Sequence, residues 1–457
     1  MKHSRRAQPI RLICLMTLAA VCLLAGCAAP GASGQAVAAA SQPPPSAPGN
    51  LARPVTTPTI EPTRAVPDTV VPASTPTALS TPTRSASPAP SPPPVVSPTA
   101  RLEPNGPPHD PGPLTWAHPG PYIAPGDTNF QLASFSSRQP LLTTYYFYWH
   151  DLTNPARRAR MNDFWAQQPP DPGEYTFASP ATHRQQFTDM QAAGIDFALP
   201  VYWGEPGHPG RAFNPTAPHF WSTEGIPPMV EALDQMAAAG HPFKIGMFYD
   251  TTILANADLT TPDGKAYFYV NVRDFYSRIP PKYWAAIDGH PIVWLYDTQW
   301  VSKYDQSSLD YLSDHFARDF GGLRPYIVRE WQWYQSKGVQ PQVVMKSDNL
   351  YAWGAAPSGF NQDPRLGVSE VGPGFSNTLY CKTGLAGNCF DVDRRNGAYY
   401  TGELEAALRA GRTIAAVETW NEFSEGSDVA DTVQFGRTYI ELTRRFADAF
   451  HAGRRSF

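Results

Sequence analysis

Short apolar segments alternate with amphipathic ones from about residue 140 to the C-terminus. Most of the apolar segments are near-continuous runs, which is typical of parallel strands covered by helices. The expected strands occupy residues 143–150, 195–203, 243–250, 291–297, 325–330, 349–353, 367–372 and 413–420. The pattern therefore predicts a parallel sheet of eight strands.

Helical spacing of apolar residues appears between these strands. The expected helices cover residues 183–193, 227–239, 271–279, 309–320, 402–410 and 433–450. Gly194 and Gly240 follow the first two at C-cap positions, and Pro280 ends the third. The connections after the fifth and sixth strands are short, so we expect reduced helices there.

The alternation of strands and helices defines the fold class as α/β. Eight strand–helix repeats predict a (β/α)8 TIM barrel over residues 114–457. An open doubly wound sheet is the alternative. It is disfavoured because no Gly-rich phosphate turn follows the first strand.

The N-terminus has the pattern of an export signal over residues 1–26. A basic start precedes an apolar run at residues 12–24, which is too short for an ordinary transmembrane helix. The sequence LLAGC at residues 23–27 resembles the bacterial lipobox. This resemblance implies a lipid on Cys27, membrane attachment through that anchor, and a protein on the outside of the bacterial cell envelope. The alternative is an ordinary secretory signal with a chance cysteine.

Residues 27–113 form a segment of different composition. Residues 28–113 contain 23 prolines among 86 positions, mixed with Ser, Thr and Ala, and the first aromatic residue of the chain is Trp116. Such a segment buries too little apolar surface to offset the entropy lost on ordering. We therefore expect a disordered linker between the lipidated Cys27 and the barrel.

Cysteine content and charge narrow the functional class. Three of the five cysteines lie at or before the lipobox, which leaves Cys381 and Cys389 as one pair. Because the protein is expected to be exported, we predict a disulfide between them. A metal site is the alternative, but no His or second Cys pair lies near.

The net charge of the chain bears on its class of ligand. A formal net charge of −4 argues against a nucleic-acid binder.

Aromatic and acidic residues gather at the expected strand ends. Active sites of (β/α)8 barrels lie at the C-terminal ends of the strands. Aromatic rings stack on sugar faces, and acids bond to sugar hydroxyls, so this combination predicts a carbohydrate site. The candidate substrate-binding residues are Tyr148, Trp149, His150, Tyr202, Trp203, Glu205, Asp250, Tyr296 and Trp353. Singly, each aromatic could be a packing residue, and Asp250 could be a helix N-cap.

The last strand leads into ETWNEFSEG at residues 418–426. Glu422 and Glu425 follow the strand, where the chain must turn, so both can reach one rim of the barrel. Glycoside cleavage usually needs one protonated and one ionised carboxyl group. Mutual repulsion would raise one pKa and separate these roles. Strand alternation places Glu418 on the same side as Trp420 and Glu422, in a supporting position.

Residues 420–426 resemble the WNEWHEG motif of glycoside hydrolase family 99. Supporting matches occur in the same order at residues 194–204, 371–375 and 395–400. The resemblance implies a metal-independent barrel with retaining endo-α-mannosidase chemistry. It implies that Glu422 is the base on the sugar 2-hydroxyl, which attacks as internal nucleophile through an epoxide-like intermediate. Glu425 would then be the general acid and base.

The resemblance also indicates further site residues and one departure. Trp420, Asn421 and Tyr399 match family positions and are expected to contact substrate. Phe423 and Ser424 replace the Trp and His of the motif. The resemblance therefore implies the same class of reaction, but it does not identify the sugar.

The sequence as a whole predicts a retaining glycoside hydrolase acting on a polysaccharide or glycan, such as an α-mannan-like polymer, without metal or cofactor. The alternative is a non-catalytic surface glycan-binding lipoprotein with the same aromatic residues.

Asp391, Asp393 and Asn396 suggest a calcium loop, but Arg395 stands where an oxygen ligand is needed, so a solvated loop is the better interpretation. The linkage, endo or exo action, and the oligomeric state are left open.

Overall fold

The computed structural model describes residues 132, 134–155, 158, 165–204, 220–382 and 389–457. The predicted signal peptide, Cys27, the Pro-rich linker and Glu205 lie outside these residues.

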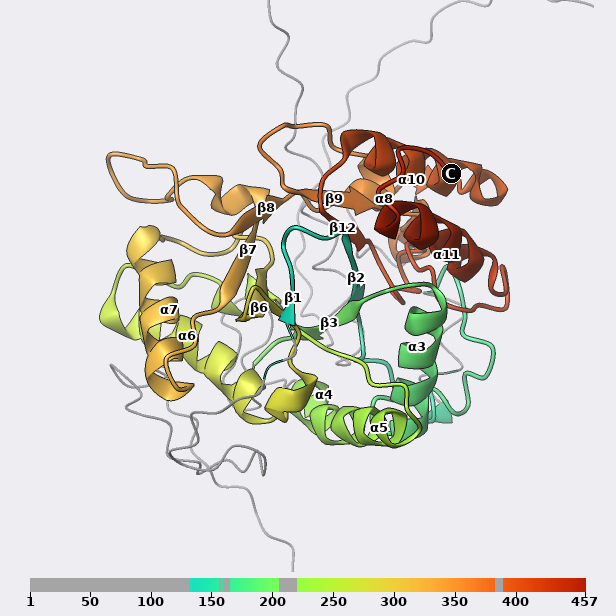
Figure 1. Cartoon of the computed structure of the whole chain (residues 1–457), viewed down its shortest axis with the longest axis horizontal. Helices are drawn as coiled ribbons and strands as arrows, with labels where there is room; N and C mark the ends of the chain where they lie inside the picture. Colours follow the sequence, from blue (N-terminus) through green and yellow to red (C-terminus); the bar gives the residue numbers. More distant parts are fainter. Residues whose placement is uncertain (1–131, 133, 156–157, 159–164, 205–219, 383–388) are drawn as a thin grey trace, which may run out of the picture. The chain divides into compact units, whose positions relative to one another are not determined.

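Parallel strands form a closed ring in the described part of the chain (Figure 1). In ring order they are β2 (Leu141–Tyr146), β3 (Phe197–Tyr202), β4 (Met247–Tyr249), β6 (His290–Leu295), β7 (Tyr326–Glu330), β8 (Asn349–Tyr351), β9 (Val368–Val371) and β12 (Ile414–Val417). Parallel ladders join neighbours from β2 through to β8, and β12 pairs with both β9 and β2. Gly367 N donates to Leu350 O at 3.0 Å and links β8 to β9. The closed ring confirms the (β/α)8 barrel and excludes the open sheet.

Two separate apolar clusters explain why nearly every strand position is buried. Side chains alternate across each strand, so one set points to the barrel axis and the other to the helices. The axial set includes Leu141, Tyr145, Phe197, Leu199, Phe248, Trp294, Val328, Tyr351, Val368, Ile414 and Ala416. The outer set joins Leu142, Tyr146, Val293, Ala415 and Val417 to helix residues such as Phe187, Met190 and Leu233. A strand buried on both faces needs a continuous apolar run, as the sequence has.

Helices surround the ring (Figure 1). They are α3 (Pro180–Ala192), α4 (Phe220–Glu224), α5 (Ile226–Ala238), α6 (Pro262–Ser277), α7 (Gln306–Asp319), α10 (Ala398–Ala410) and α11 (Thr438–His451). Only short turns follow β7 and β8, namely η3 (Trp331–Tyr334) and α8 (Ala355–Ser358), as predicted. The expected start of α6 at residue 271 was wrong. Its N-cap is Thr261, whose side chain accepts from Gly264 N at 3.1 Å, and Pro262 occupies the first turn.

Small elements complete the described chain. At the barrel start, β1 (Ser134–Phe135) pairs with β5 (Ala286–Ile287), and η2 (Pro281–Tyr283) precedes β5. After β4 comes η1 (Thr251–Leu254). Between β9 and α10 lie β10 (Phe375–Ser376), α9 (Thr378–Lys382), β11 (Asp391–Val392) and η4 (Arg395–Gly397), and β10 and β11 pair antiparallel.

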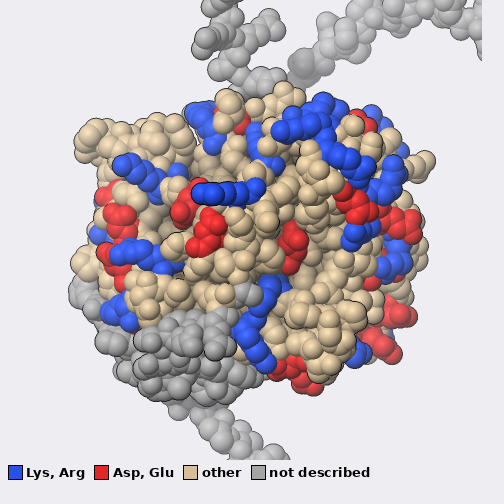
Figure 2. Space-filling model, in the orientation of Figure 1, with Lys and Arg blue, Asp and Glu red and all other residues tan. Residues whose placement is uncertain are grey.

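Charged side chains of both signs are interspersed on the face shown in Figure 2, and basic side chains gather over α10 and α11, whose sequences contain arginine but no lysine. Several of these arginines pair with an acid one helical turn away, as Arg409 does with Glu405 and Arg444 with Asp448. Exposed pairs of this kind contribute little to stability. Among the described residues, no helix combines the length and apolar composition needed to cross a lipid bilayer.

Candidate active site

The motif loop, defined as residues 418–428, leaves the barrel at the C-terminal end of β12. Glu418 N still pairs with Val371 O on β9 at 2.8 Å. Trp420 N donates to Tyr145 O on β2 at 3.0 Å. These bonds continue the barrel's pairing beyond the strand, so the loop is anchored on both neighbouring strands.

Glu422 and Glu425 lie on one tight turn of the motif loop. Glu425 N donates to Glu422 O at 3.2 Å, and Gly426 follows with φ +57°, a left-handed conformation that favours glycine. Both residues are buried: Glu422 is 2% exposed and Glu425 is 7% exposed. Within the described part of the chain, Glu422 Oε2 and Glu425 Oε1 have no hydrogen-bond partner. One oxygen of each acid is therefore enclosed without a hydrogen bond from the described residues.

The environment of the pair favours protonated acids. Burial and the charge of Glu425 raise the pKa of Glu422 well above its usual range. Burial, assisted by the charge of Glu418, raises the pKa of Glu425 to about 8. The Ser424 hydroxyl donates to Glu422 Oε1, which favours the ionised form of Glu422. At neutral pH, Glu425 is therefore suited to act as an acid.

Glu418 supports the site from the strand end. Its Oε2 accepts from Gly354 N at 2.8 Å and Ala355 N at 2.9 Å. Burial raises the pKa of Glu418 to about 7, although these backbone bonds act to lower it. The predicted shared side with Trp420 is wrong. The Trp420 ring packs in the outer cluster and donates to Gln186 Oε1 on α3 at 2.7 Å, because regular alternation ends with β12.

Two further buried acids were missing from the predicted site. Glu370 on β9 accepts from the Tyr145 hydroxyl, and its Oε2 has no partner among the described residues. Burial and the charge of Glu418 raise the pKa of Glu370 well above its usual range. Burial and the charge of Asp297 raise the pKa of Glu330 to about 8. An acid within an apolar run, as in GVSEVG at 367–372, was the available signal for Glu370.

Trp149, Trp203, Tyr296 and Trp353 belong to the axial cluster, as a substrate-facing role requires. Trp149 and Trp203 have ring centroids 6.0 Å apart, and Tyr296 and Trp353 are 5.0 Å apart. Trp353 is also 5.1 Å from Tyr145. These rings lie near the C-terminal end of the barrel and remain the candidates for stacking on a sugar.

Other predicted contacts point away from the axis. Tyr148 and Tyr202 belong to the outer cluster; the Tyr148 hydroxyl donates to Ser222 O at 2.7 Å, and the Tyr202 hydroxyl donates to Asp274. His150 is buried beside Trp165, with ring centroids 4.7 Å apart. This placement argues against substrate contact by these three residues, because helices and loops cover them.

The remaining candidates have mainly local roles. Asp250 caps η1, and its Oδ1 accepts from Thr252 N at 3.1 Å, which matches the N-cap alternative. Burial raises the pKa of Asp250 to about 6. The Tyr399 hydroxyl donates to the carbonyl oxygens of Ala355 and Ala356, each at 3.3 Å. Tyr399 thus contacts the α8 turn that also binds Glu418.

Asn421 fastens the motif loop to the chain after β2. Its Oδ1 accepts from Phe147 N at 2.8 Å, and its Nδ2 donates to Phe147 O at 2.7 Å and to Tyr175 Oη at 2.8 Å. Asn421 is fully buried, and these bonds use its amide for structure. These contacts give Asn421 a structural role, and its contact with substrate stays a prediction.

We expect Asn421→Ala to lower the free energy of unfolding by about 2–5 kcal/mol, because it leaves buried backbone groups of Phe147 unpaired. Urea unfolding followed by circular dichroism measures this loss. Asn361→Ala is the control, since Asn361 is exposed and its side chain accepts from Asp363 N at 3.0 Å in an exposed turn. Equal, small losses in both variants would contradict the assigned role.

The buried acids also predict how stability varies with pH. Glu330 and Glu425 have pKa values of about 8 when folded, against about 4.3 in an unfolded chain. The folded protein thus holds protons that the unfolded chain has lost, so stability falls as pH rises toward 8. Burial lowers the pKa of His150 to about 3 and of His183 to about 4, which has the opposite effect only below about pH 6.5.

Between pH 6.5 and 8 the free energy of unfolding should therefore fall, by up to ~1.4 kcal/mol per pH unit for each acid that stays protonated. Urea titrations at several pH values measure this slope. Glu330→Gln should make the slope shallower. Stability that is constant or rising over this range would show that the acids are ionised in the folded protein.

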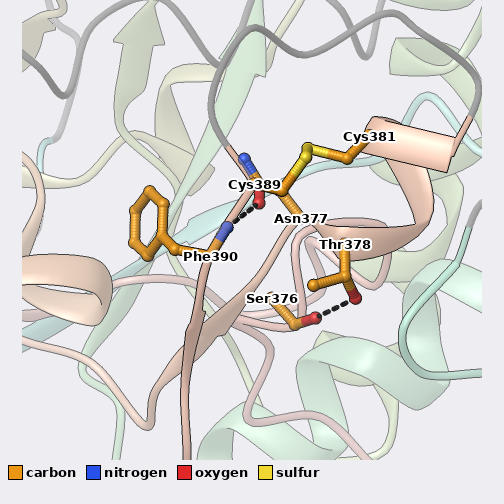
Figure 3. Close-up of a disulfide and its surroundings, with 6 residues drawn as sticks. All are labelled: Ser376, Asn377, Thr378, Cys381, Cys389 and Phe390. Carbon is orange, nitrogen blue, oxygen red and sulfur yellow. Dashed lines mark hydrogen bonds between the residues drawn. A yellow bond between two sulfur atoms is a disulfide. The ribbon is translucent and has the colours of Figure 1, made fainter. Parts of the chain in front are cut away.

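Cys381 and Cys389 form the predicted disulfide, with Cα atoms 5.5 Å apart (Figure 3). Next to it, Asn377 Oδ1 accepts from Phe390 N at 3.0 Å. In the suggested calcium segment, Asp393 Oδ1 instead accepts from Arg395 N at 2.8 Å. Within the described residues, no group of three or more His, Cys, Asp or Glu side chains is arranged to hold a metal ion.

Solved structures similar to this chain include glycoside hydrolases. The GH99 endo-α-mannosidase from Bacteroides thetaiotaomicron is 16% identical, with 68% of this chain and 98% of that chain covered and a TM-score of 0.47. A glycoside hydrolase-like protein is 14% identical, with coverages of 71% and 99% and a TM-score of 0.49. The α-L-fucosidase from Vibrio sp. strain EJY3 is 10% identical, with coverages of 68% and 53% and a TM-score of 0.32.

Sequence comparison gives a family for most of the barrel. No curated protein matches the chain significantly. The profile of one family matches residues 174–455, from the chain before α3 to just beyond the end of α11. The chain therefore belongs to the family described as "Domain of unknown function (DUF5010)".

Proposed function

We propose that this protein is a retaining glycoside hydrolase that acts on a polysaccharide or glycan. The observation that carries the proposal is the buried pair Glu422 and Glu425, on one turn at the C-terminal end of a (β/α)8 barrel. Axial aromatic rings near the same end supply surfaces for a sugar. A non-catalytic glycan-binding protein would not need two buried acids with raised pKa values.

The proposed reaction assigns one role to each glutamate. Glu422 acts in its ionised form, which the Ser424 hydroxyl favours against the effects of burial and of Glu425. It removes the proton from the sugar 2-hydroxyl, whose oxygen attacks the anomeric carbon and forms an epoxide-like intermediate. Glu425 donates its proton to the departing glycosidic oxygen as the old bond breaks. Water then attacks the anomeric carbon, Glu425 takes its proton, and Glu422 returns a proton to O2. Two inversions give net retention.

Phe423 and Ser424 depart from the WNEWHEG motif of glycoside hydrolase family 99, and the two departures have different consequences. Phe423 is fully buried against Trp165 and Tyr175, with ring centroids 5.7 Å and 5.6 Å away. Its change from Trp therefore alters packing behind the motif loop. Ser424 contacts Glu422 directly. We propose that Ser424 is the departure that bears on the base and on the sugar it accepts.

Hydrolysis of a glycan panel that includes α-mannan tests the proposed function. Proton NMR of the first product from the best substrate then reports the anomeric configuration. We expect cleavage with retained configuration. Binding without cleavage would support the glycan-binding alternative, and an inverted product would refute the participation of O2.

We also propose that Cys27 carries a lipid that anchors the protein to the outside of the cell envelope. The lipobox resemblance and the following Pro-rich segment support this proposal. Metabolic labelling with an alkyne fatty acid should mark the wild-type chain and not Cys27→Ser. Equal labelling of both would refute lipidation at this residue.

A further inference from the structure

The chain between β9 and α10 contacts the motif loop. Its described residues, 372–382 and 389–397, are called the excursion here. Its strands β10 and β11 pair antiparallel, and the disulfide between Cys381 and Cys389 closes the segment between them. Figure 3 shows the disulfide beside the bond between Asn377 and Phe390. These links join the two described parts of the excursion, on either side of residues 383–388, to each other.

Two residues of this excursion, Ser376 and Arg394, bond to the chain that follows the Glu425 side chain. Ser376 N donates to the backbone carbonyl of Glu425 at 2.7 Å. Arg394 Nη2 donates to Gly426 O at 2.9 Å and to Asp428 Oδ1 at 3.2 Å. The backbone that follows Glu425 is therefore held from outside the motif loop, at the carbonyls of both Glu425 and Gly426.

Arg394 is itself fixed in place. It is 6% exposed, and its guanidinium lies 4.8 Å from the ring centroid of Phe435 and 4.4 Å from that of Tyr439. A Cβ atom at Gly374 would lie 2.8 Å from Arg394 Cγ, so the excursion packs closely on the arginine stem. A planar guanidinium can stack on aromatic rings while one of its nitrogens bonds to two acceptors, whereas an ammonium has no planar face to stack.

We propose that Arg394 is the positioning residue of the catalytic acid, which it holds in place through Gly426 and Asp428. This inference rests on the proposed function, because it assigns a purpose to the placement of Glu425. Arg394 bonds to the Gly426 carbonyl and the Asp428 carboxylate, and neither bond involves Glu422 or Glu425, so its effect passes through the loop that carries them. A misplacement of about 1 Å can cost on the order of 10²-fold in rate.

The test uses Arg394→Lys, Asp428→Asn and the double variant in the full chain. Arg412→Lys is the matched control. Arg412 also bonds to backbone carbonyls, at Val368 and Asp363, but these lie at the start of β9 and before it. One readout is the pKa of Glu425 from carbon-13 NMR of labelled glutamate, assigned with Glu425→Gln. The other is kcat on the best glycan substrate.

We expect either single variant to lower kcat about 10²-fold with KM within threefold, and to move the pKa of Glu425 by at least one unit toward its ordinary value. The double variant should lose no more than the single ones, because both changes disturb the same charged contact between Arg394 and Asp428. Arg412→Lys should change neither readout. Should Arg394→Lys fail to fold, Asp428→Asn provides both readouts.

A folded variant with unchanged kcat or an unchanged Glu425 pKa would overturn the proposal, as would equal effects in Arg412→Lys. If the wild type cleaves no glycan, the proposed function fails. The NMR readout then still decides the positioning role, because a pKa change in Arg394→Lys and not in Arg412→Lys supports it. The two failures are therefore distinguishable.

Discussion

Replacing Glu425 with Gln should slow the hydrolysis of glycans with poor leaving groups by about 10²–10⁴-fold. A sugar alkoxide leaves slowly unless a proton reaches it as the bond breaks. Burial keeps the pKa of Glu425 at about 8, so this side chain holds the needed proton at neutral pH. Gln has almost the same shape but no acidic proton. Initial rates of reducing-sugar release measure the loss.

The leaving group provides an internal control for this prediction. An activated aryl glycoside departs without a proton, so Glu425→Gln should lose far less activity on it. Glu403→Gln is the matched control variant, because burial also raises the pKa of Glu403, to about 7, but this residue lies on α10. A uniform loss on both kinds of substrate would remove the acid role from Glu425.

Replacing Glu422 with Gln should abolish activity regardless of the leaving group, with a loss of about 10²–10⁴-fold. The base on O2 is needed to form the intermediate, whichever group departs. An equal loss on natural and activated substrates separates this role from that of Glu425. Parallel rate measurements on the two substrates give both losses.

Ser424→Ala is the companion variant for Glu422→Gln. It removes the hydroxyl that donates to Glu422 and favours its ionised form, so we expect a smaller loss of activity. The basic and acidic limbs of the pH–rate profile show whether the loss follows the ionisation of the base. If Glu422→Gln keeps near wild-type rates on either substrate, Glu422 is not the base.

The sequence predicted the barrel because strands buried on both faces must be apolar throughout. The runs at residues 195–203 and 291–297 coincide with β3 and β6 to within a few residues. The start of α6 was missed because Pro262 and Gly264 are typical of a turn. The cap at Thr261 makes them the first turn of a helix instead.

The site could be predicted only in part. Glu422 and Glu425 follow from their spacing after the last strand, and the structure places both on one buried turn. Which ring faces the barrel axis depends on the parity of each strand, and a doubly buried strand has no polar face to reveal it. For that reason Tyr202 and Trp203, which are adjacent, were both predicted to bind substrate, yet only Trp203 points inward.

Hydrolysis of a single glycan panel by the wild type, Glu425→Gln and Glu403→Gln, run side by side, decides whether the buried Glu425 on the motif loop takes part in glycoside cleavage. We expect the wild type and Glu403→Gln to release sugar from the same glycan at similar rates, with Glu425→Gln at least about 10²-fold slower. A Glu425→Gln protein that is folded and as active as the wild type would contradict this assignment.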